Sequence, residues 1–598
     1  MKKLVSEEEL VKGAERKRIR QGKMWSLIMR ILRISRLNAL YDKHYSADPQ
    51  VFIDRVMSAL EVELVVNEDE LANIPKDGAF ITVSNHPYGG LDGIVLMKLV
   101  GSQRPDYKIW ANFVLQRVEP LQDFILPINP FNASLSDTSN ISGLRATMTH
   151  LQDGHPIGMF PAGEVSSLHS GHITDKKWNS GALKLVQRAE VPIVPIYFKG
   201  RNSALFHILG LISPLLRTVK LPSELLNKQA RRIEVRIGKP ISVKDQKQFA
   251  DVNQLGRYIR TKTYALGLPL EVKKFFKNRM KRMVTPEPIQ PPQSDVDILN
   301  EINALGTDAH LFDSGDFALY CASSDQIPIT LQEIGRLREL TYREVGEGTN
   351  YACDLDEFDL YYQHLIIWDK VHHKIVGGYR IGKGSDIMWR YGVRGLYIHQ
   401  LFKLKTATFP ILKESLELGR SYIVKEYQRK PLPLFLLWKG ILVYLLKHPE
   451  CRYLIGPVSI SDKFSGFSKG ILIEFLKRNF YDDVVAKHIK PRKKFKPSVQ
   501  DIDIDILLES SQHDLAKLDR IIQDVEPNNL NIPVLFKKYL KQNAKIIGFN
   551  LDPKFNNALD GLMLLDIYDV PANTITSLMN ELDDEELNEA LHSRNLVA

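Results

Sequence analysis

The sequence predicts an α/β protein made of two domains. Its 598 residues are too many for one ordinary domain, and 44% of them are hydrophobic, which is enough for globular cores. A proline-rich run at residues 285–294 is typical of an extended linker between the halves. In both halves, strand-like apolar runs alternate with helical patterns, as α/β order requires. The expected parts are basic amphipathic helices at 1–45, a first domain at 46–284, a linker at 285–305 and a second domain at 306–598.

In the first domain, two glycine-rich turns each follow a strand-like run. Residues 79–83 precede a turn that carries His86 and Asp92, and residues 157–160 precede a turn that carries Glu164 and Ser166. A strand followed by such a turn holds polar groups rigidly at the edge of a sheet. A histidine, two acids and a hydroxyl are the parts of an acyl-transfer site.

His86 is the candidate general base of that site. A neutral imidazole can remove the proton of a hydroxyl that attacks a thioester, and a carboxylate such as Asp92 can fix its tautomer. Gly89 and Gly90 make the intervening turn tight enough for the two side chains to meet. The alternative is that His86 is an ordinary loop histidine and that Asp92 caps the helix beginning near Gly93. Asp92 can also do both.

These turns, with a later strand at 191–197, resemble the glycerophospholipid acyltransferases over residues 75–245. Five residues separate His86 from Asp92 where the family has four, and Ala162 stands where the family has a glutamate. Neither of the two family arginines that grip a phosphate has a counterpart in its motif, which argues against a lysophosphatidic acid as acceptor. By resemblance, His86 and Asp92 are catalytic, and the substrate-binding residues are Asn85, Gly163, Glu164 and Ser166.

The second domain is expected to have a three-layer α+β or α/β order of helices and strands. A helical pattern begins at Leu331, alternating strands follow at 364–368 and 374–381, and a further strand at 416–424 leads into an apolar helix at 432–446. Several motifs on this frame resemble the hemolysin-type GNAT acyltransferases, which are related to acyl-homoserine lactone synthases. The resemblance spans about residues 310–570. It implies Glu417 as a catalytic residue and a substrate-binding set of Arg338, Asp356, Asp359, Arg380 and Arg420.

The chemistry of this set suits an amino-acid substrate. Carboxylates can hold an ammonium group, and an arginine can bind a carboxylate with two hydrogen bonds. Glu417 is the candidate base that takes a proton from the attacking amine. The alternative is a structural network of arginines and acids that ties strand to helix.

The donor is expected to be an acyl carrier protein thioester, with acyl-coenzyme A as the other possibility and no bound cofactor. GNAT enzymes that use coenzyme A have a glycine-rich loop for its pyrophosphate, and residues 428–433 at that place contain no glycine. The three cysteines, Cys321, Cys353 and Cys451, have no metal-ligand spacing, so no metal site is expected.

A membrane surface is the other expected partner. Residues 24–40 form a basic amphipathic pattern with a tryptophan, residues 204–216 are apolar, and the net charge is +9. Both apolar runs of the chain, 204–216 and 434–446, are too short to span a bilayer. The alternative for 24–40 is a helix packed on its own domain. The basic run 487–496 reads as a solvated surface, and no motif supports nucleic-acid binding.

Together these features predict a peripheral enzyme on the cytoplasmic face of the inner membrane that makes an amino-acid lipid. The second domain would N-acylate an amino acid from a 3-hydroxyacyl carrier protein, and the first domain would O-acylate the hydroxyl of the resulting lyso-lipid. Ornithine is the default amino acid, with glycine or another equally allowed. The alternative is a single-activity lysophospholipid (1-acylglycerol-3-phosphate) acyltransferase whose C-terminal domain binds the carrier protein. A non-enzymatic lipid-binding scaffold is the third possibility.

Overall fold

The computed structural model divides the chain into two compact units, each described here by itself. Unit 1 comprises residues 1–273, 499–512 and 523–529, and unit 2 comprises residues 274–498, 513–522 and 530–598. Two short segments from late in the sequence therefore belong to unit 1. The structure describes residues 33–111, 118–128, 138–169, 172–212, 214–227, 232–267, 286–496, 502–511, 514–526, 530–579 and 589.

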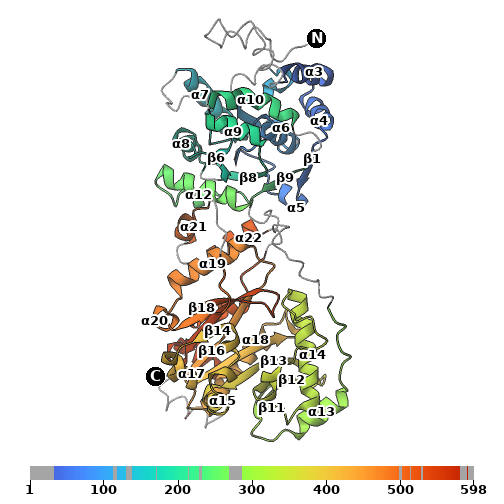
Figure 1. The fold of residues 1–598 in the computed structure, drawn as a ribbon, viewed down its shortest axis with the longest axis vertical. Coiled ribbons are helices and arrows are strands. Elements are labelled where there is room, and N and C mark those ends of the chain that lie inside the picture. The colour runs from blue at the N-terminus through green and yellow to red at the C-terminus, as the bar shows by residue number, and fades with distance from the viewer. Residues whose placement is uncertain are drawn as a thin grey trace. The chain divides into compact units, whose positions relative to one another are not determined.

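Unit 1 is built on a seven-stranded sheet with the order β1-β9-β8-β2-β5-β3-β4 (Figure 1). Neighbouring strands run parallel except β8 and β9, which are antiparallel. The strands are β1 (Glu63–Val66), β2 (Ile81–Ser84), β3 (Lys108–Ala111), β4 (Ile125–Pro127), β5 (Ile157–Met159), β8 (Ile193–Lys199) and β9 (Arg232–Ile237). The predicted strands at 79–83, 157–160 and 191–197 are present as β2, β5 and β8.

Strand β2 lies in the middle of this sheet, and its residues are buried on both faces. Parallel strands covered by helices on both sides are expected to read as continuous apolar runs, as this one does. A separate hairpin, β6 (Ser167–His169) with β7 (His172–Thr174), follows the second glycine-rich turn. The longer helices of unit 1 are α3 (Ile34–His44), α4 (Pro49–Ala59), α6 (Gly90–Leu99), α7 (Thr138–Gln152), α8 (Ser180–Ala189), α9 (Ala204–Ile212), α10 (Pro214–Leu226), α12 (Val252–Ala265) and α21 (Ile504–Ser511).

Unit 2 is built on an eight-stranded sheet with the order β10-β11-β12-β13-β15-β16-β19-β18. Neighbours are antiparallel except β15 and β16, which run parallel from the pair Ser415 and Tyr453 to the pair Glu417 and Ile455. The strands are β10 (His310–Ser314), β11 (Phe317–Ser323), β12 (Gln363–Asp369), β13 (Lys374–Lys383), β15 (Ser415–Ile423), β16 (Tyr453–Ile460), β18 (Lys545–Asp552) and β19 (Ala558–Asp566).

Helices pack on this sheet, and the predicted helix at 432–446 is α18, which connects β15 to β16. Apolar residues surround nearly the whole circumference of α18, which is the pattern of a buried helix. The main helices of unit 2 are α13 (Asp295–Ala304), α14 (Pro328–Val345), α15 (Gly384–Tyr391), α18 (Pro431–Lys447), α19 (Gly466–Asn479), α23 (Val534–Lys541) and α24 (Ala572–Met579), and α22 (Leu515–Val525) belongs in part to each unit.

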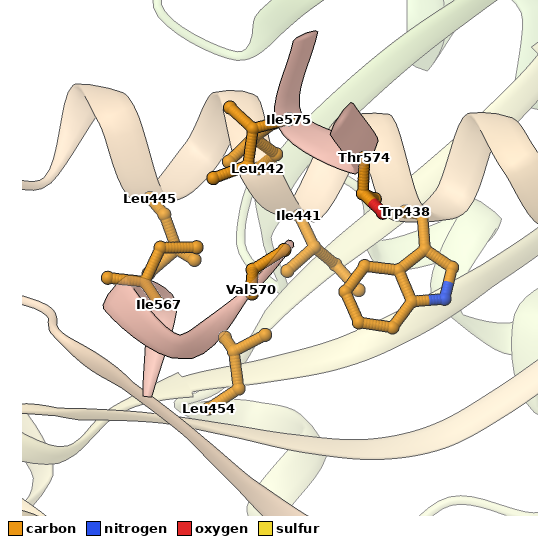
Figure 2. A pocket seen from close by; sticks show the side chains of 9 residues that line it. All are labelled: Trp438, Ile441, Leu442, Leu445, Leu454, Ile567, Val570, Thr574 and Ile575. Atoms are coloured by element: carbon orange, nitrogen blue, oxygen red, sulfur yellow. The ribbon is translucent and has the colours of Figure 1, made fainter. Parts of the chain in front are cut away.

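A small cavity lies between α18, strand β16 and the segment that leads into α24 (Figure 2). Trp438, Ile441 and Leu445 line it from the helix, and Leu454 lines it from the strand. Thr574 is its one polar lining residue. Because no acid, base or nucleophile faces this space, it belongs to the packing of the core rather than to a reaction centre.

Three expectations about the chain's segments have different outcomes. The predicted extended linker ends earlier than residue 305, because Ser294 caps helix α13. Residues 286–294 belong to unit 2, where the Glu287 N–H donates to the Asn350 carbonyl oxygen at 2.9 Å. Of the basic pattern at 24–40, residues 24–32 lie outside the described residues. Within the described part of the chain, no helix has the length and apolarity needed to cross a bilayer.

Candidate active sites

The first candidate site begins where strand β2 ends. The Asn85 side chain donates from Nδ2 to the Phe198 carbonyl oxygen at 2.9 Å and accepts from the Phe198 N–H at 2.7 Å. These bonds fasten the turn to strand β8. Asn85 is predicted to bind substrate, and in the structure its amide group fastens the turn that carries His86 to strand β8.

His86 and Asp92 meet across this turn. His86 Nδ1 lies 2.9 Å from Asp92 Oδ2, and the same oxygen accepts the N–H groups of Tyr88 at 2.9 Å and Gly89 at 3.0 Å. Asp92 stands in the first turn of α6, so it caps the helix and orients the imidazole at once. Its side chain is fully buried.

Gly89 makes the longer turn possible. Its φ of +87° lies in the region that only glycine adopts without strain, and a Cβ there would lie 2.8 Å from Leu221 Cδ1. The extra residue between His86 and Asp92 is thereby absorbed without separating the two side chains.

One nitrogen of the imidazole is hydrogen-bonded to Asp92, and the other has no hydrogen-bond partner within the described residues. The backbone N–H groups on Asp92 Oδ2 mark that oxygen as an acceptor, so His86 Nδ1 carries the hydrogen and Nε2 the lone pair. Within the described residues, Nε2 has no hydrogen-bond partner, and the side chain is 17% exposed. Phe160 stacks on the ring with centroids 4.0 Å apart. This arrangement leaves Nε2 of His86 able to accept a proton.

The second glycine-rich turn closes against the first. Gly163 has a φ of +70°, and beyond it the Ser166 N–H donates to the His86 carbonyl oxygen at 2.8 Å. The Ser166 hydroxyl donates to Asp175 Oδ1 at 2.5 Å, and the His86 N–H lies 3.3 Å from the same oxygen. Ser166 and Gly163, both predicted to bind substrate, therefore join the two turns.

Asp175 is a buried acid that sequence reasoning missed. It stands alone between two lysines and a threonine, in no motif. Burial raises the pKa of its carboxyl, and bonds from Ser166, His86 and Trp178 partly offset that effect. Its side chain accepts hydrogen bonds from His86 in the first turn and from Ser166 in the second turn, and so joins the two turns.

Glu164 is held by two cations. Its oxygens lie 2.6 Å from Arg217 and 2.5 Å from Lys176. The motif itself has no arginine, which argued against a lysophosphatidic acid as acceptor, but the structure brings a guanidinium to the turn from another segment. Arg217 comes from helix α10, more than fifty positions further along the chain, so only the fold brings it to the turn.

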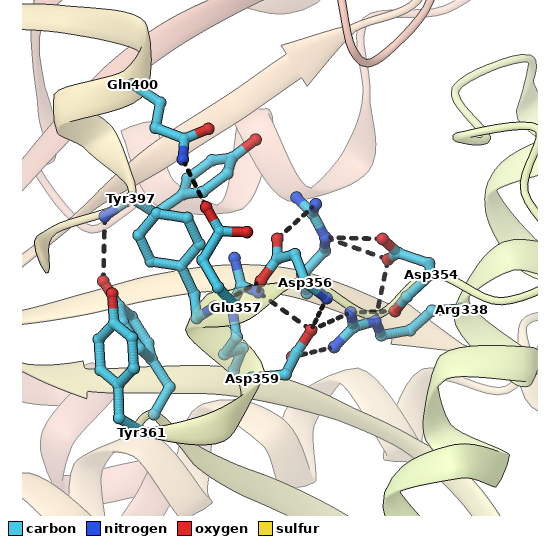
Figure 3. Close-up of polar contacts among 12 residues, drawn as sticks. Arg338, Asp354, Asp356, Glu357, Asp359, Tyr361, Tyr397 and Gln400 are labelled. Atoms are coloured by element: carbon cyan, nitrogen blue, oxygen red, sulfur yellow. Dashed lines mark hydrogen bonds and ion pairs between the residues drawn. The ribbon is translucent and has the colours of Figure 1, made fainter.

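The second candidate site is a network of buried charged side chains from α14, the segment 354–359, β13 and β15 (Figure 3). Arg338 Nε donates to Asp354 Oδ2 at 2.9 Å, and its two terminal nitrogens donate to Asp359 at 2.8 and 3.0 Å. Although burial alone raises the pKa of Asp359, Arg338 and Arg380 hold it below its usual range. Arg338 and Asp359, both predicted to bind substrate, thus chiefly neutralise one another.

Asp356, Arg380 and Arg420 continue this network; Arg380 is buried, and the side chains of Arg420 and Asp356 are 10% and 21% exposed. Arg380 donates to Asp356 Oδ1 at 2.5 Å, and Arg420 lies 3.3 Å from Asp356 Oδ2. Nε and Nη2 of Arg380 are buried and have no partner within the described residues. Arg420 has a φ of +53°, a backbone strain that its bonds to Asp354 and Asp356 help to hold. Arg380 therefore has two donors that no acceptor uses within the described residues.

Glu417 is buried on β15, next to this network. It accepts the Tyr362 hydroxyl at 2.6 Å and the N–H groups of Ile398 at 2.8 Å and Tyr397 at 3.2 Å. Burial raises the pKa of Glu417 to about 7, despite these bonds and the Arg380 charge. A carboxylate with that pKa is matched to proton transfer at neutral pH. The residues left out of the predicted site here are Asp354, which begins the acidic motif at 354–359, and Tyr362 and Tyr397, which lie outside the motifs.

Two family descriptions match the chain. Residues 14–272 match "Acyltransferase", and residues 337–438 match "Acetyltransferase (GNAT) domain". The chain is 27% identical over 267 residues to the glycine N(alpha)-acyltransferase of Bacteroides thetaiotaomicron, covering 42% of this chain and 78% of that protein. It is 28% identical over 222 residues to the lyso-glycine lipid O-acyltransferase of the same organism, covering 36% of this chain and 79% of that protein.

The chain is an acyltransferase. Its α/β fold with two domains, one of acyltransferase type and one of GNAT type, is confirmed. Two solved structures are also similar to this acyltransferase, at levels that carry no functional weight. The 1-acyl-sn-glycerophosphate acyltransferase of Thermotoga maritima has 16% identity, a TM-score of 0.24 and coverage of 39% of this chain and 90% of its own. A CoA-dependent acyl-homoserine lactone synthase has 12% identity, a TM-score of 0.22 and coverage of 45% and 96%.

Proposed function

We propose that this acyltransferase makes an amino-acid lipid in two successive acyl transfers. Unit 2 acylates the nitrogen of an amino acid with a 3-hydroxyacyl chain, and unit 1 then esterifies the chain's hydroxyl. The names of the two relatives describe one reaction of each kind, which favours this order and favours glycine over ornithine as the amino acid. The observation that carries the proposal is the His86–Asp92 pair, in which Nδ1 is bonded and Nε2 has no hydrogen-bond partner within the described residues.

In the O-acylation step, His86 acts as the general base. Nε2 takes the proton of the 3-hydroxyl as its oxygen attacks the thioester carbonyl. The ester C–O bond forms, the C–S bond breaks, and the imidazolium returns the proton to the departing thiolate. Asp92 steadies the imidazolium, and this kind of base catalysis typically contributes about 10²–10⁴-fold to a rate.

In the N-acylation step, Glu417 takes the proton of the attacking amine, directly or through water. The amide C–N bond forms, the C–S bond of the donor breaks, and the proton passes on to the thiolate. The spare donors of Arg380 suit the substrate carboxylate, because a guanidinium binds such a group in its own plane.

The donor is an acyl carrier protein. Helix α18 begins with prolines at positions 431 and 433, so two of its first three residues lack the N–H groups that would bind a pyrophosphate. A carrier protein presents its thioester on a flexible arm and does not need that anion site, and its acidic surface suits a chain with a net charge of +9.

The enzyme works peripherally on the cytoplasmic face of the inner membrane, where its lipid product belongs. Two large apolar side chains of α9, Leu205 and Ile208, are 49% and 53% exposed. Both lie in the apolar run that the sequence marked as a segment for dipping into lipid.

A second candidate function is supported by the cations at Glu164. Arg217 and Lys176 together carry one more charge than Glu164 neutralises, so they can attract a phosphate as well as a carboxylate. This favours a single-activity lysophospholipid acyltransferase, whose acceptor would be a 1-acylglycerol-3-phosphate.

The test uses the purified full-length enzyme with 3-hydroxyacyl carrier protein. Glycine, ornithine and lysophosphatidic acid are offered in parallel, and the products are identified by mass spectrometry. We expect N-(3-hydroxyacyl) amino acid first and the di-acylated lipid when a second acyl carrier protein is added. Acylation of lysophosphatidic acid alone would replace this proposal with the second candidate. Replacing the carrier protein by acyl-coenzyme A tests the donor, and we expect that exchange to lower the rate.

A further inference from the structure

A second group of buried acids lies at the other end of the unit 2 sheet. Asp552 ends strand β18, and Asp560 stands on the neighbouring strand β19. The register pairs Asp560 with Asn550, two positions before Asp552, and with Ser459 on β16. Side chains at paired positions, and at positions two apart, share one face of a sheet. Asp552, Asp560 and Ser459 therefore lie on the same face.

Glu347 joins this face from the segment after helix α14. The Ser459 hydroxyl donates to Glu347 Oε2 at 2.7 Å, and Asp552 Oδ2 accepts the Tyr397 hydroxyl at 3.2 Å. Asp560 is different, because it is 4% exposed and its Oδ2 has no hydrogen-bond partner within the described residues. A buried acceptor without a donor is costly and needs an explanation.

The charges around Asp560 are mostly negative. Asp552 and Glu347 face it, and the one cation acting on it is Arg420. The Arg420 guanidinium is shared with Asp354 and Asp356, so it supplies little compensation. The charges of Lys463 and Lys469 act on Glu347. Burial raises the pKa of the Tyr397 hydroxyl, and the charge of Asp560 acts on that hydroxyl in the same direction.

Tyr397 connects these acids to the arginine network. Its hydroxyl bonds to Asp552, and its ring centre lies 5.2 Å from the guanidinium carbon of Arg380. The buried Arg380 guanidinium, with its unused donors, therefore lies at the ring of Tyr397. The buried Asp560 carboxyl, with its unused acceptor, belongs to the acid group beyond the Tyr397 hydroxyl. The unused donors of Arg380 and the unused acceptor of Asp560 match the carboxylate and the ammonium group of a zwitterion.

We propose that Asp560, supported by Asp552 and Glu347, binds the ammonium group of the amino acid whose nitrogen is acylated. An ammonium group is a compact cation with three donors and no acceptor, which fits a set of carboxyl oxygens. Among the residues that the structure describes, no three acids, histidines or cysteines are arranged to hold one ion, so Asp560 alone is proposed to bond to the ammonium group, and Asp552 and Glu347 act through their charges. The inference rests on the N-acylation step proposed above and names the anchor of its acceptor.

Binding at this site releases a proton. Burial, with the charges of Asp552 and Glu347, raises the pKa of Asp560 well above its usual range, which favours the protonated carboxyl in the free enzyme. When the ammonium group arrives, Asp560 gives its proton to solvent and becomes the partner carboxylate. No covalent bond of the ligand changes, and the charge balance is one proton out for one cation in.

The experiment is calorimetric titration of the full-length enzyme with glycine and with ornithine, in two buffers of different ionisation enthalpy at neutral pH. We expect proton release with either amino acid and none with acetate, which lacks the ammonium group. Asp560→Asn, which keeps the shape of the side chain, should abolish the proton release and weaken binding at least about tenfold. Asp569→Asn, at an exposed aspartate of the same unit, should change neither quantity.

Two outcomes would overturn the inference: unchanged binding and proton release in Asp560→Asn, or no proton-coupled binding of either amino acid by the wild-type enzyme. The outcomes also separate this inference from the proposed function. If the wild-type enzyme acylates an amino acid and Asp560→Asn leaves the KM for that amino acid unchanged, the reaction stands and the anchor is wrong. If neither amino acid is acylated but proton-coupled binding is lost in the variant, the anchor stands and the proposed reaction is wrong.

Discussion

Asp92 Oδ2 receives three hydrogen bonds, and one of them, at 2.9 Å, comes from His86 Nδ1. The same atom therefore accepts N–H groups of the turn that leads into helix α6, and it also fixes the tautomer of the imidazole. A carboxylate committed in this way cannot easily rotate away, so His86 presents Nε2 in one orientation. The catalytic role proposed for this pair follows from that geometry.

Replacing Asp92 by asparagine should separate its two roles. Asparagine keeps an oxygen that can cap α6, so the melting temperature should fall only slightly. The imidazole loses its carboxylate, and the rate of O-acylation should fall by about 10²–10⁴-fold. Kinetics of the second acyl transfer, measured beside thermal unfolding, check both expectations. The matched control is Asp106→Asn, because Asp106 holds His155 Nδ1 at 2.8 Å outside the candidate site. An equal loss of rate in that control would contradict the assignment.

The pH dependence of N-acylation should report on Glu417. Its pKa of about 7 means that the basic form is lost as the pH falls below neutral, so the rate should decline on the acid side. Glu417→Gln should lose most of the rate and the acid limb with it. A variant that is slow but keeps the same limb would show that another group is the base.

The stability of Glu417→Gln should change with pH in a set direction. A pKa raised from 4.5 to about 7 means that burial of this acid costs nothing below pH 4.5 and up to about 3 kcal/mol once the pH exceeds 7. The variant removes that cost, so its stability relative to wild type should rise between those pH values. Denaturant unfolding at pH 5 and pH 8 measures the difference. A constant difference would mean that Glu417 is not buried in the way described.

Arg217 should determine which acceptors unit 1 accepts. Replacing it by glutamine leaves Glu164 with Lys176 alone, which removes the spare positive charge. The KM for an anionic acceptor should rise at least about tenfold, and acylation of an uncharged long-chain alcohol should be unaffected. The exposed pair of Lys247 with Glu190 provides the control Lys247→Gln. Equal effects on charged and uncharged acceptors would contradict a binding role for Arg217.

Membrane association should depend on helix α9. Changing Leu205 and Ile208 to aspartate removes the insertion of two large apolar side chains, and each is worth about 1.5–3 kcal/mol when fully buried. Sedimentation with vesicles that contain anionic lipid should show at least a tenfold weaker partition. Val371→Asp, at an exposed valine of unit 2, should have no effect. Unchanged sedimentation of the α9 double variant would place the lipid contact elsewhere.

Local patterns predicted the elements well, because they depend on residues close in sequence. Strand β2, the turn after it and the cap at Asp92 all follow from one stretch of about a dozen residues, and the structure brings His86 to Asp92 as expected. The buried helix α18 was equally predictable from the sequence, since nearly its whole surface is apolar.

Partners that arrive from distant segments could not be predicted. Arg217 reaches Glu164 only because α10 folds back over the turn, and Asp175 reaches His86 only through the hairpin that precedes it. No pattern along the chain marks Asp560 as unpaired, because its isolation depends on which atoms lie around it. The predicted roles of Arg338, Asn85 and Ser166 came from motif resemblance, and the structure shows their polar atoms bonded within the protein.

The most direct test of the central claim is lipid mass spectrometry of a host that lacks amino-acid lipids and expresses the full chain. The account predicts a new di-acylated amino-acid lipid from the wild type, and accumulation of the mono-acylated N-acyl amino acid from His86→Ala. His155→Ala, which alters a histidine–aspartate pair outside the site, should still give the di-acylated product. A full yield of di-acylated lipid from His86→Ala would contradict the account.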